Sequence, residues 1–313
     1  MRLFRSKHQK LEAAKFYVQP QPSANPPDRI AIAVLVKDEA EPIAEWLRFH
    51  YAAGVDKFLL YDDGCSDATF SVAGEAVPTE AIEIIPWSQR IKEEKSGYAL
   101  DNQGLAFAHA VSNYGEDFRW MAFIDVDEFL FPTRSHSLKD YLLSLGDIDN
   151  IVLPWQMFGR QGFAETPPLV LPNFLKRFRD PYQANVKGVL NFKCIVNPSR
   201  VTKAYVHGFE TNHSSDIYNS LGQKFEFGEH RQANFHCAAA LQLNHYYAKS
   251  DQQFKEKVEK GAINESTFTR HFKRLDGRSD TLLRRVQEIE RDTVEDRLIL
   301  EFCKRMAFDF NAV

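Results

Sequence analysis

Residues 120–131 constrain the fold of this chain more than any other segment. They form an apolar run of strand length that is interrupted by Asp125-Val126-Asp127-Glu128. Such a run predicts a buried strand, as found in parallel sheets that are covered by helices. In open α/β sheets, ligands bind beyond the carboxyl ends of the strands. We therefore predict that these three carboxylates lie where a ligand would bind.

Carboxylates this close together repel one another unless a cation lies among them. Oxygen ligands suit Mg²⁺ or Mn²⁺. One hypothesis is therefore a divalent cation at Asp125 and Asp127 that holds a diphosphate. The alternative is an ordinary acidic turn after a strand, because D-x-D is a short and common pattern.

The rest of the chain alternates between segments typical of strands and of helices. Strands are predicted at residues 30–36, 57–61, 82–85, 151–157, 192–196 and 204–209. Helices are predicted at residues 43–54, 100–114 and 137–145, from the capping box Ser250–Gln253 onward, and from Asp280 onward. The β-α-β rhythm of the first half predicts an α/β fold with a mostly parallel, Rossmann-like sheet flanked by helices.

Three parts of the chain are expected from these patterns. Residues 1–28 form a basic leader and a proline-rich linker, residues 29–261 the α/β domain, and residues 262–313 a helical C-terminal extension. A length of 313 residues suffices for one large α/β domain with additions.

Composition and charge narrow the class of protein. A net charge of −4 gives no sign of general nucleic-acid binding. The four cysteines are scattered, which favours a reducing compartment, with two disulfides as the alternative. Without an apolar signal-peptide core at the N-terminus, a cytoplasmic location is expected. The basic leader, with Leu3, Phe4, Leu11 and Phe16, could contact the inner face of a membrane; the alternatives are a solvated tail or a segment that packs on a neighbour.

Charged side chains follow three strands of the predicted parallel sheet. Lys37, Asp38 and Glu39 follow the first strand, Asp62 and Asp63 the second, and the D-x-D pair the fourth. Because the carboxyl ends of parallel strands share one edge, these groups are expected to face one crevice. Three charged strand ends together favour a polar-ligand site, although each turn alone is ordinary turn chemistry.

Taken together, these segments make the chain resemble the GT-A glycosyltransferases, above all glycosyltransferase family 92 and related bacterial family-2-like proteins. The resemblance covers roughly residues 30–260 and rests on four motifs in order: K-[ND]-E, E-W-x-x-[FY]-H, Y-D-[DN]-x-S-x-D and D-x-D-E-F. They stand here at residues 37–39, 45–50, 61–67 and 125–129, with Cys65 as a mild departure from the usual Asn or Ser. Residues 193–198 and 243–250 also look similar.

The resemblance implies a GT-A-like fold and an inverting hexosyltransferase that uses Mn²⁺ or Mg²⁺. The donor would be a nucleotide sugar, and a UDP-sugar is the first expectation. The resemblance also implies Asp127 as a direct metal ligand, Asp125 as a ligand of the metal or of the ribose, and Glu128 as a brace for the turn. His245 would be the third metal ligand, with a packed histidine beside two tyrosines as the alternative. Donor-binding residues would be Lys37, Asp38, Glu39, Asp62, Asp63, Asp125 and Lys249. The acceptor would be a glycan or a lipid-linked glycan, such as a polysaccharide precursor.

An inverting transfer also requires a general base that deprotonates the acceptor hydroxyl. Three carboxylates are candidates: Glu165, Glu210 and Asp216. His207 could shape the acceptor pocket, and Lys193 could contact phosphate.

Two rival functions fit parts of the same pattern. A haloacid dehalogenase-type phosphohydrolase also carries D-x-D after an apolar strand, but there the motif follows the first strand of the domain, and Phe129 occupies a position where Thr or Val is usual. A nucleotide-sugar or glycan-binding protein without turnover is the other rival.

Overall fold

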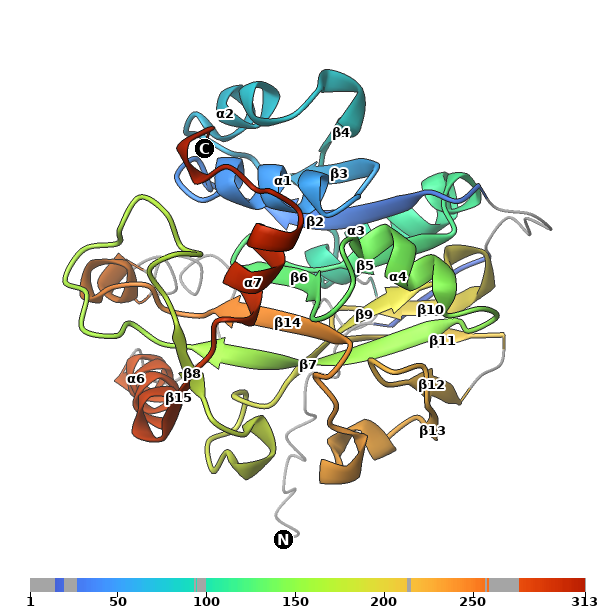
Figure 1. The fold of residues 1–313 in the computed structure, drawn as a ribbon. Coiled ribbons are helices and arrows are strands. Elements are labelled where there is room, and N and C mark those ends of the chain that lie inside the picture. The colour runs from blue at the N-terminus through green and yellow to red at the C-terminus, as the bar shows by residue number, and fades with distance from the viewer. Residues whose placement is uncertain are drawn as a thin grey trace, which may run out of the picture.

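The computed structural model describes residues 15–19, 27–92, 94, 100–212, 215–256, 258 and 276–312. Most strands belong to one mixed sheet with the order β13-β12-β7-β9-β5-β2-β3-β4, to which β14, β6, β8 and β15 are attached (Figure 1). A separate small sheet has the order β1-β10-β11. The predicted α/β fold class is confirmed.

The half of the sheet before the D-x-D motif is parallel. It consists of β5 (Trp120–Phe123), β2 (Ile30–Val36), β3 (Lys57–Asp62) and β4 (Ile82–Pro86). Helices α1 (Ile43–Ala52), α2 (Thr69–Ala76) and α3 (Asn102–Tyr114) alternate with these strands. Gly54 follows the end of α1 with a φ of +101°, a conformation that suits glycine, so the predicted helix end is confirmed.

The residues of β2 explain how helices cover both faces of this half. Ile30, Ile32, Val34 and Val36 pack on one face in the same cluster as α1, while Ala31 and Ala33 pack on the other face with α3. Side chains alternate between the faces of a strand. Small alanines on one face and branched residues on the other therefore let α3 approach closely while α1 rests on a bulkier layer.

Beyond β5 the sheet becomes mixed. Strand β9 (Phe192–Val196) lies antiparallel between β5 and β7 (Asn150–Phe158). Strand β14 (Leu241–Tyr246) lies between β6 (Glu128–Pro132), to which it is antiparallel, and β7, to which it is parallel. At the carboxyl end of β7, β8 (Lys176–Phe178) pairs with β15 (Thr293–Glu295). At its amino end, β12 (Asp216–Tyr218) pairs with β13 (Lys224–Glu226).

Helix α1 satisfies backbone groups of β6 with two of its side chains. The indole Nε1 of Trp46 donates to the carbonyl of Glu128 at 2.7 Å, and Leu130 N donates to His50 Nε2 at 3.1 Å. Both side chains are fully buried. The E-W-x-x-F-H helix therefore holds the D-x-D-E-F segment in place through hydrogen bonds.

The two ends of the described chain join the main fold. Strand β1 (Phe16–Tyr17) pairs with β10 (Val201–Tyr205), which pairs with β11 (Gly208–Thr211), so the region predicted as a leader contributes a strand. The single last helix predicted from Asp280 is instead two helices, α6 (Asp276–Arg291) and α7 (Leu298–Arg305), separated by β15. Helix α4 (Leu138–Ser144) agrees with its prediction.

Leu3, Phe4, Leu11 and Gly261 lie outside the described residues. Among the helices that are described, none combines the length and the apolar character needed to cross a bilayer.

Candidate functional site

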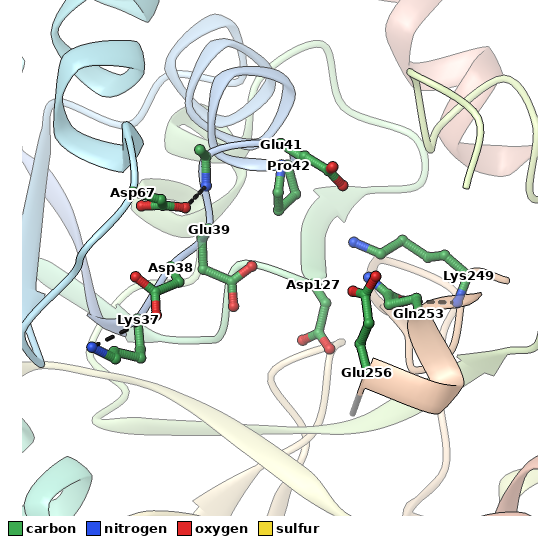
Figure 2. A pocket seen from close by; sticks show the side chains of 11 residues that line it. Lys37, Asp38, Glu39, Glu41, Pro42, Asp67, Asp127, Lys249, Gln253 and Glu256 are labelled. Atoms are coloured by element: carbon green, nitrogen blue, oxygen red, sulfur yellow. Dashed lines mark hydrogen bonds and ion pairs between the residues drawn. The ribbon is translucent and has the colours of Figure 1, made fainter. Parts of the chain in front are cut away.

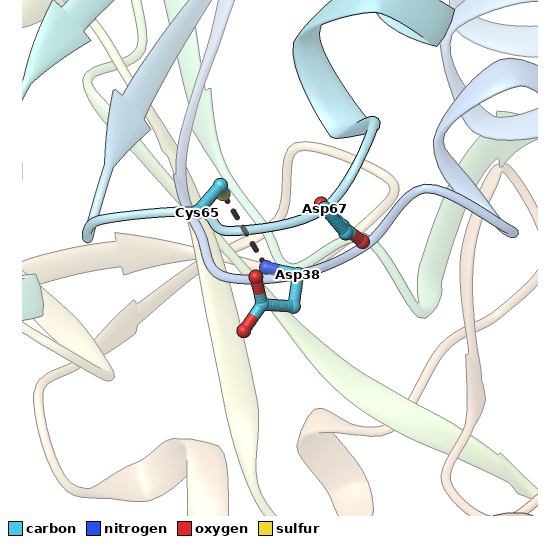
Figure 3. Close-up of side chains that lie close together, drawn as sticks. All are labelled: Asp38, Cys65 and Asp67. Carbon is cyan, nitrogen blue, oxygen red and sulfur yellow. Dashed lines mark hydrogen bonds between the residues drawn. The ribbon is translucent and has the colours of Figure 1, made fainter.

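The loops after β2 and β3 are bound to each other at one edge of the sheet. Asp38, with a φ of +52°, accepts hydrogen bonds from the backbone N of Ser66 at 2.7 Å and from its hydroxyl at 3.1 Å. Its own N–H points at Cys65 Sγ, 3.3 Å away (Figure 3). These bonds hold the pKa of Asp38 below its ordinary value. The predicted convergence of the two loops is therefore observed.

Most carboxylates in the turn after β3 already have protein partners. Asp62 Oδ1 accepts from Gly64 N at 2.9 Å and Cys65 N at 2.7 Å, which shapes the turn. Asp63 Oδ1 accepts from Arg90 at 2.7 Å and from Asn102 at 2.8 Å. Both residues lie on the predicted rim, where Asp62 shapes the backbone and Asp63 joins the turn to Arg90 and to the first residue of α3.

Asp125 lies just beyond β5 and is held by two side chains. Gln103 Nε2 donates to Oδ1 at 2.6 Å, and Lys193 Nζ donates to Oδ2 at 2.8 Å. The Lys193 side chain is only 1% exposed, and its ammonium also lies 3.9 Å from Glu128 Oε2. Burial lowers the pKa of Lys193, but Asp125 and Glu128 raise it more, so the net pKa is above its ordinary value. The lysine therefore remains an ammonium group that compensates the two carboxylates.

Asp127, Glu128 and His245 form one of two groups among the described residues whose ligand atoms are close enough to hold a cation, the other being Asp38, Cys65 and Asp67. Asp127 Oδ2 lies 3.3 Å from His245 Nε2, and each of the three residues offers one ligand atom within 4.8 Å of the others. Two ligands at about 2.1 Å from an octahedral cation are roughly 3.0 Å apart, so Asp127 and His245 fit as adjacent ligands. The Nδ1 of His245 and the Oε1 of Glu128 are buried without a hydrogen-bond partner among the described residues. Carboxylate oxygen with one imidazole suits Mn²⁺, and suits Mg²⁺ less well.

A cleft opens beside Asp127 between the loop after β2 and the helix that begins at Asp251. Its volume is about 430 Å³. It is lined by Lys37, Asp38, Glu39, Ala40, Glu41, Pro42, Asp67, Asp127, Lys249, Gln253 and Glu256 (Figure 2). Six of these side chains are carboxylic and two are ammonium groups. A diphosphate would be repelled by this excess of negative charge unless a cation accompanied it.

The helix start predicted from the capping box Ser250–Gln253 is confirmed, but the reciprocal bond of the box goes to Lys249 N and not to Ser250 N. Gln253 N donates to Ser250 Oγ at 3.0 Å, while Gln253 Oε1 accepts from Lys249 N at 3.0 Å. Lys249 is 4% exposed and lines the cleft opposite Asp38 and Glu39 (Figure 2). The backbone of this turn is thus fixed where the lysine enters the site.

The three predicted base candidates are not brought together. Glu165 is exposed in the loop after β7, whose Ala164 carbonyl accepts from Gln252 N at 3.0 Å beside the cleft. Glu210 pairs with Lys203 on β11, and Asp216 pairs with Lys224 at 2.6 Å on β12.

The pairing of β7 explains this separation. Strand β12 meets β7 at Ile151, whereas β14 pairs with β7 from Trp155 to Phe158 and places His245 opposite Met157. Asp216 is therefore at the amino end of β7, remote from Asp127. Glu210 lies beside Phe209, whose carbonyl accepts from Asn150 at that same end.

His207 is engaged on both ring nitrogens. Its Nδ1 lies 3.2 Å from the carbonyl of Phe192, and its Nε2 lies 3.0 Å from the amide of Asn191. The carbonyl must accept, so Nδ1 donates and Nε2 accepts. His207 and His245 both pack edge-on against Trp155, at centroid distances of 5.6 and 4.3 Å.

Several site residues were not predicted from the sequence. Gln103, which holds Asp125, and Asp67, Gln253 and Glu256, which line the cleft, were not assigned to the site. For Gln253 the capping box gave its local position, and for Asp67 the acidic turn did. Gln103 carried no signal, because a polar residue in the first turn of a helix is common.

The mixed sheet, the acidic strand ends and the late histidine together define a GT-A-like α/β domain with a candidate cation site. The family model for glycosyltransferase family 92 matches residues 30–276, and the chain belongs to this family.

Curated relatives agree with this assignment. A family 92 protein of Oryza sativa subsp. japonica is 22% identical over 73% of this chain and 35% of its own length. One of Ricinus communis is 22% identical over 74% of this chain and 37% of its own length. The chain thus spans little more than a third of these relatives. Among solved structures, S. aureus TarS in complex with UDP is 15% identical, with a TM-score of 0.31, over 55% of this chain and 47% of that chain.

Proposed function

We propose that this protein is a metal-dependent inverting glycosyltransferase that moves a hexose from a nucleotide sugar to a glycan or lipid-linked acceptor. A UDP-sugar is the donor that we propose first. The observation that carries the proposal is the placement of Asp127 Oδ2 and His245 Nε2, 3.3 Å apart, beside an acidic cleft. Family membership and the four motifs support the same reaction class.

Asp127 and His245 would hold the divalent cation, Mn²⁺ or Mg²⁺, with Asp125 nearby as a further ligand or as the acceptor for a ribose hydroxyl. Bound there, the cation would neutralise charge on the departing nucleoside diphosphate. Asp125 is suited to the ribose because its side chain is 34% exposed while Lys193 and Gln103 fix its orientation. Lys249 and Lys37 would place ammonium groups beside the phosphates.

The loops after β2 and β3 would form the nucleoside side of the site. Asp38, Glu39, Asp62 and Asp63 lie on this rim, and Asp62 and Asp63 organise the turn through the bonds described above. Asp62 therefore supports the donor by shaping backbone that faces it.

Among the three base candidates, Glu165 is the one whose loop borders the cleft-lining helix, and we propose it as the first to test. Glu165→Gln should lower kcat without changing the Kd for Mn²⁺ if this carboxylate removes the acceptor proton.

The proposal also covers location and acceptor. We propose that the protein is cytoplasmic, contacts the membrane peripherally through its basic leader and acts on polysaccharide precursors. Vesicle flotation with and without anionic lipid, with the full chain and with a variant in which the leader lysines and arginines are replaced by serine, tests the membrane contact.

The test of the reaction is release of nucleoside diphosphate from a panel of UDP- and GDP-sugars, with and without Mn²⁺. Asp127→Asn should abolish release, while Asp147→Asn, whose exposed carboxylate pairs with Arg200, should keep it. NMR of the product would show the inverted anomer. Full activity of Asp127→Asn would refute the metal role.

Two other outcomes would identify the rival functions. Tight binding of a nucleotide sugar without turnover of any donor would indicate a binding protein on the same fold. Phosphate release from phosphomonoesters would indicate the phosphohydrolase, which membership of family 92 argues against.

A further inference from the structure

Glu128 and His245 are direct cross-strand neighbours. Strands β6 and β14 run antiparallel, and in their register Glu128 lies opposite His245. Residues opposite each other on antiparallel strands project from the same face. Glu128 is fully buried, and His245 is 4% exposed. The two side chains therefore meet in a site largely closed to water.

Each ring nitrogen of His245 faces a different carboxylate. Nε2 lies 3.3 Å from Asp127 Oδ2, a hydrogen bond in which the ring donates because the carboxylate accepts, and Nδ1 lies 3.9 Å from Glu128 Oε1, beyond hydrogen-bond distance. Within the described part of the chain, neither Nδ1 nor Oε1 has a hydrogen-bond partner, although both are buried. A buried polar atom without a partner is costly, so two such atoms facing each other point to an interaction between them.

The other oxygen of Glu128 is already committed. Oε2 accepts the backbone N–H of Asp125 at 2.9 Å, and the backbone carbonyl of Glu128 accepts from Trp46. The His245 ring is held by Trp155, with centroids 4.3 Å apart. Oε1 is therefore the oxygen that remains for the ring, and neither side chain has much freedom to turn away.

We propose that Glu128 is a positioning residue that accepts a hydrogen bond from the proton of His245 on Nδ1 when a cation displaces the hydrogen bond from Nε2 to Asp127, so that the lone pair of Nε2 is free for the cation. This inference rests on the proposed function, because it gives Nε2 the role of a metal ligand. A histidine that binds a metal through one nitrogen usually donates the other N–H to a carboxylate or carbonyl, which fixes the tautomer.

The variant Glu128→Gln gives a specific expectation. The Asp125 N–H requires an acceptor, so the amide oxygen takes the place of Oε2 and the NH₂ group faces His245 Nδ1. An NH₂ group there favours a lone pair on Nδ1 and keeps the ring proton on Nε2. The cation would then meet an N–H in place of a lone pair, and Mn²⁺ affinity should fall by about 10–100-fold.

The primary readout is ¹⁵N NMR of selectively labelled histidine, recorded without metal and with Mg²⁺. The His245 signal is assigned by its loss in His245→Asn. The wild type should carry its proton on Nε2 without metal and on Nδ1 with Mg²⁺, whereas Glu128→Gln should keep the proton on Nε2 in both states. Mn²⁺ affinity is measured by electron paramagnetic resonance of the free ion. If Glu128 had a merely structural role, its replacement would not prevent the proton from moving to Nδ1.

Glu288→Gln is the matched control, because Glu288 is a buried carboxylate on α6 that bonds to Asn185 N and Arg291. It should change neither the His245 signal nor Mn²⁺ affinity. If Glu128→Gln does not fold, the wild-type spectrum decides alone: a proton that stays on Nε2 with Mg²⁺ overturns the proposal. So does a proton that moves to Nδ1 with Mg²⁺ in Glu128→Gln as it does in the wild type. A wild type that binds no Mn²⁺ overturns the proposed function, whichever tautomer is seen.

Discussion

Lys193 and Lys139 form ion pairs of the same length in very different surroundings. Lys193 Nζ lies 2.8 Å from Asp125, with the lysine side chain 1% exposed, and Lys139 Nζ lies 2.8 Å from Asp56, with its side chain 29% exposed. Replacing each lysine with methionine keeps the volume and removes the charge. The two variants therefore isolate the effect of burial on the free energy of unfolding.

Lys193→Met should be much the more destabilising. Removing one partner of a buried pair costs about 3–5 kcal/mol, because a buried charge is left without compensation. Here Glu128 is fully buried and Lys193 is 3.9 Å from it, whereas Asp125 is 34% exposed and can be hydrated. We therefore expect a loss near 3 kcal/mol, at the lower end of that range. Lys139→Met should cost less than about 1 kcal/mol, as for other exposed pairs.

Urea unfolding at pH 8, followed by tryptophan fluorescence, measures both values. At lower pH the deficit of Lys193→Met should shrink. Glu128, whose pKa is held well above its ordinary value by burial in spite of Lys193, then takes up a proton. Two outcomes would refute the explanation that Lys193 compensates the buried charge of Glu128: equal losses for the two variants, or a loss for Lys193→Met that does not depend on pH.

Three further predictions concern the packing around the site. Trp46→Phe leaves the carbonyl of Glu128 without its donor. The free energy of unfolding, measured in urea, should therefore fall by about 1–3 kcal/mol. Mn²⁺ affinity, measured by titration, should fall as well. Burial holds the pKa of His50 at about 3, so the folded chain resists a proton that the unfolded chain accepts near pH 6.5. Stability should therefore fall as pH drops below about 6.5, and His50→Gln should remove about 2 kcal/mol of the loss between pH 7.5 and 5 in urea unfolding. Glu45→Ala leaves the N–H groups of Val170 and Leu171 without acceptors, so hydrogen exchange at those two amides should accelerate while exchange in β3 stays unchanged.

The parallel half of the fold was predictable because its information is local. The continuous apolar run of β2 and the amphipathic face of α1 lie within short windows of sequence, and parallel strands leave one choice for the edge that carries Asp38, Asp62 and Asp125. The convergence of these carboxylates follows from that parallel arrangement.

The second half was harder to predict because its strands are short and pair with distant segments. Nothing near residue 192 indicates that β9 lies between β5 and β7, and nothing near residue 241 indicates that β14 lies between β6 and β7. For the same reason the sequence could not tell at which end of β7 Asp216 would lie. His245 was assigned through the family resemblance, and its proximity to Asp127 required the register of β14.

The insertion of β14 has a consequence for how the protein matures. His245 and Asp127 are 118 positions apart in the chain, and β14 lies between β6 and β7 and pairs with both. During synthesis, the edges of β6 and β7 that face β14 would therefore stay unpaired until residue 246 has left the ribosome. Contacts this distant in sequence slow folding, and unpaired strand edges attract other chains in the meantime. We therefore expect that nascent chains ending before β14 engage chaperones, and that cation binding appears late, in one step, when this strand is inserted.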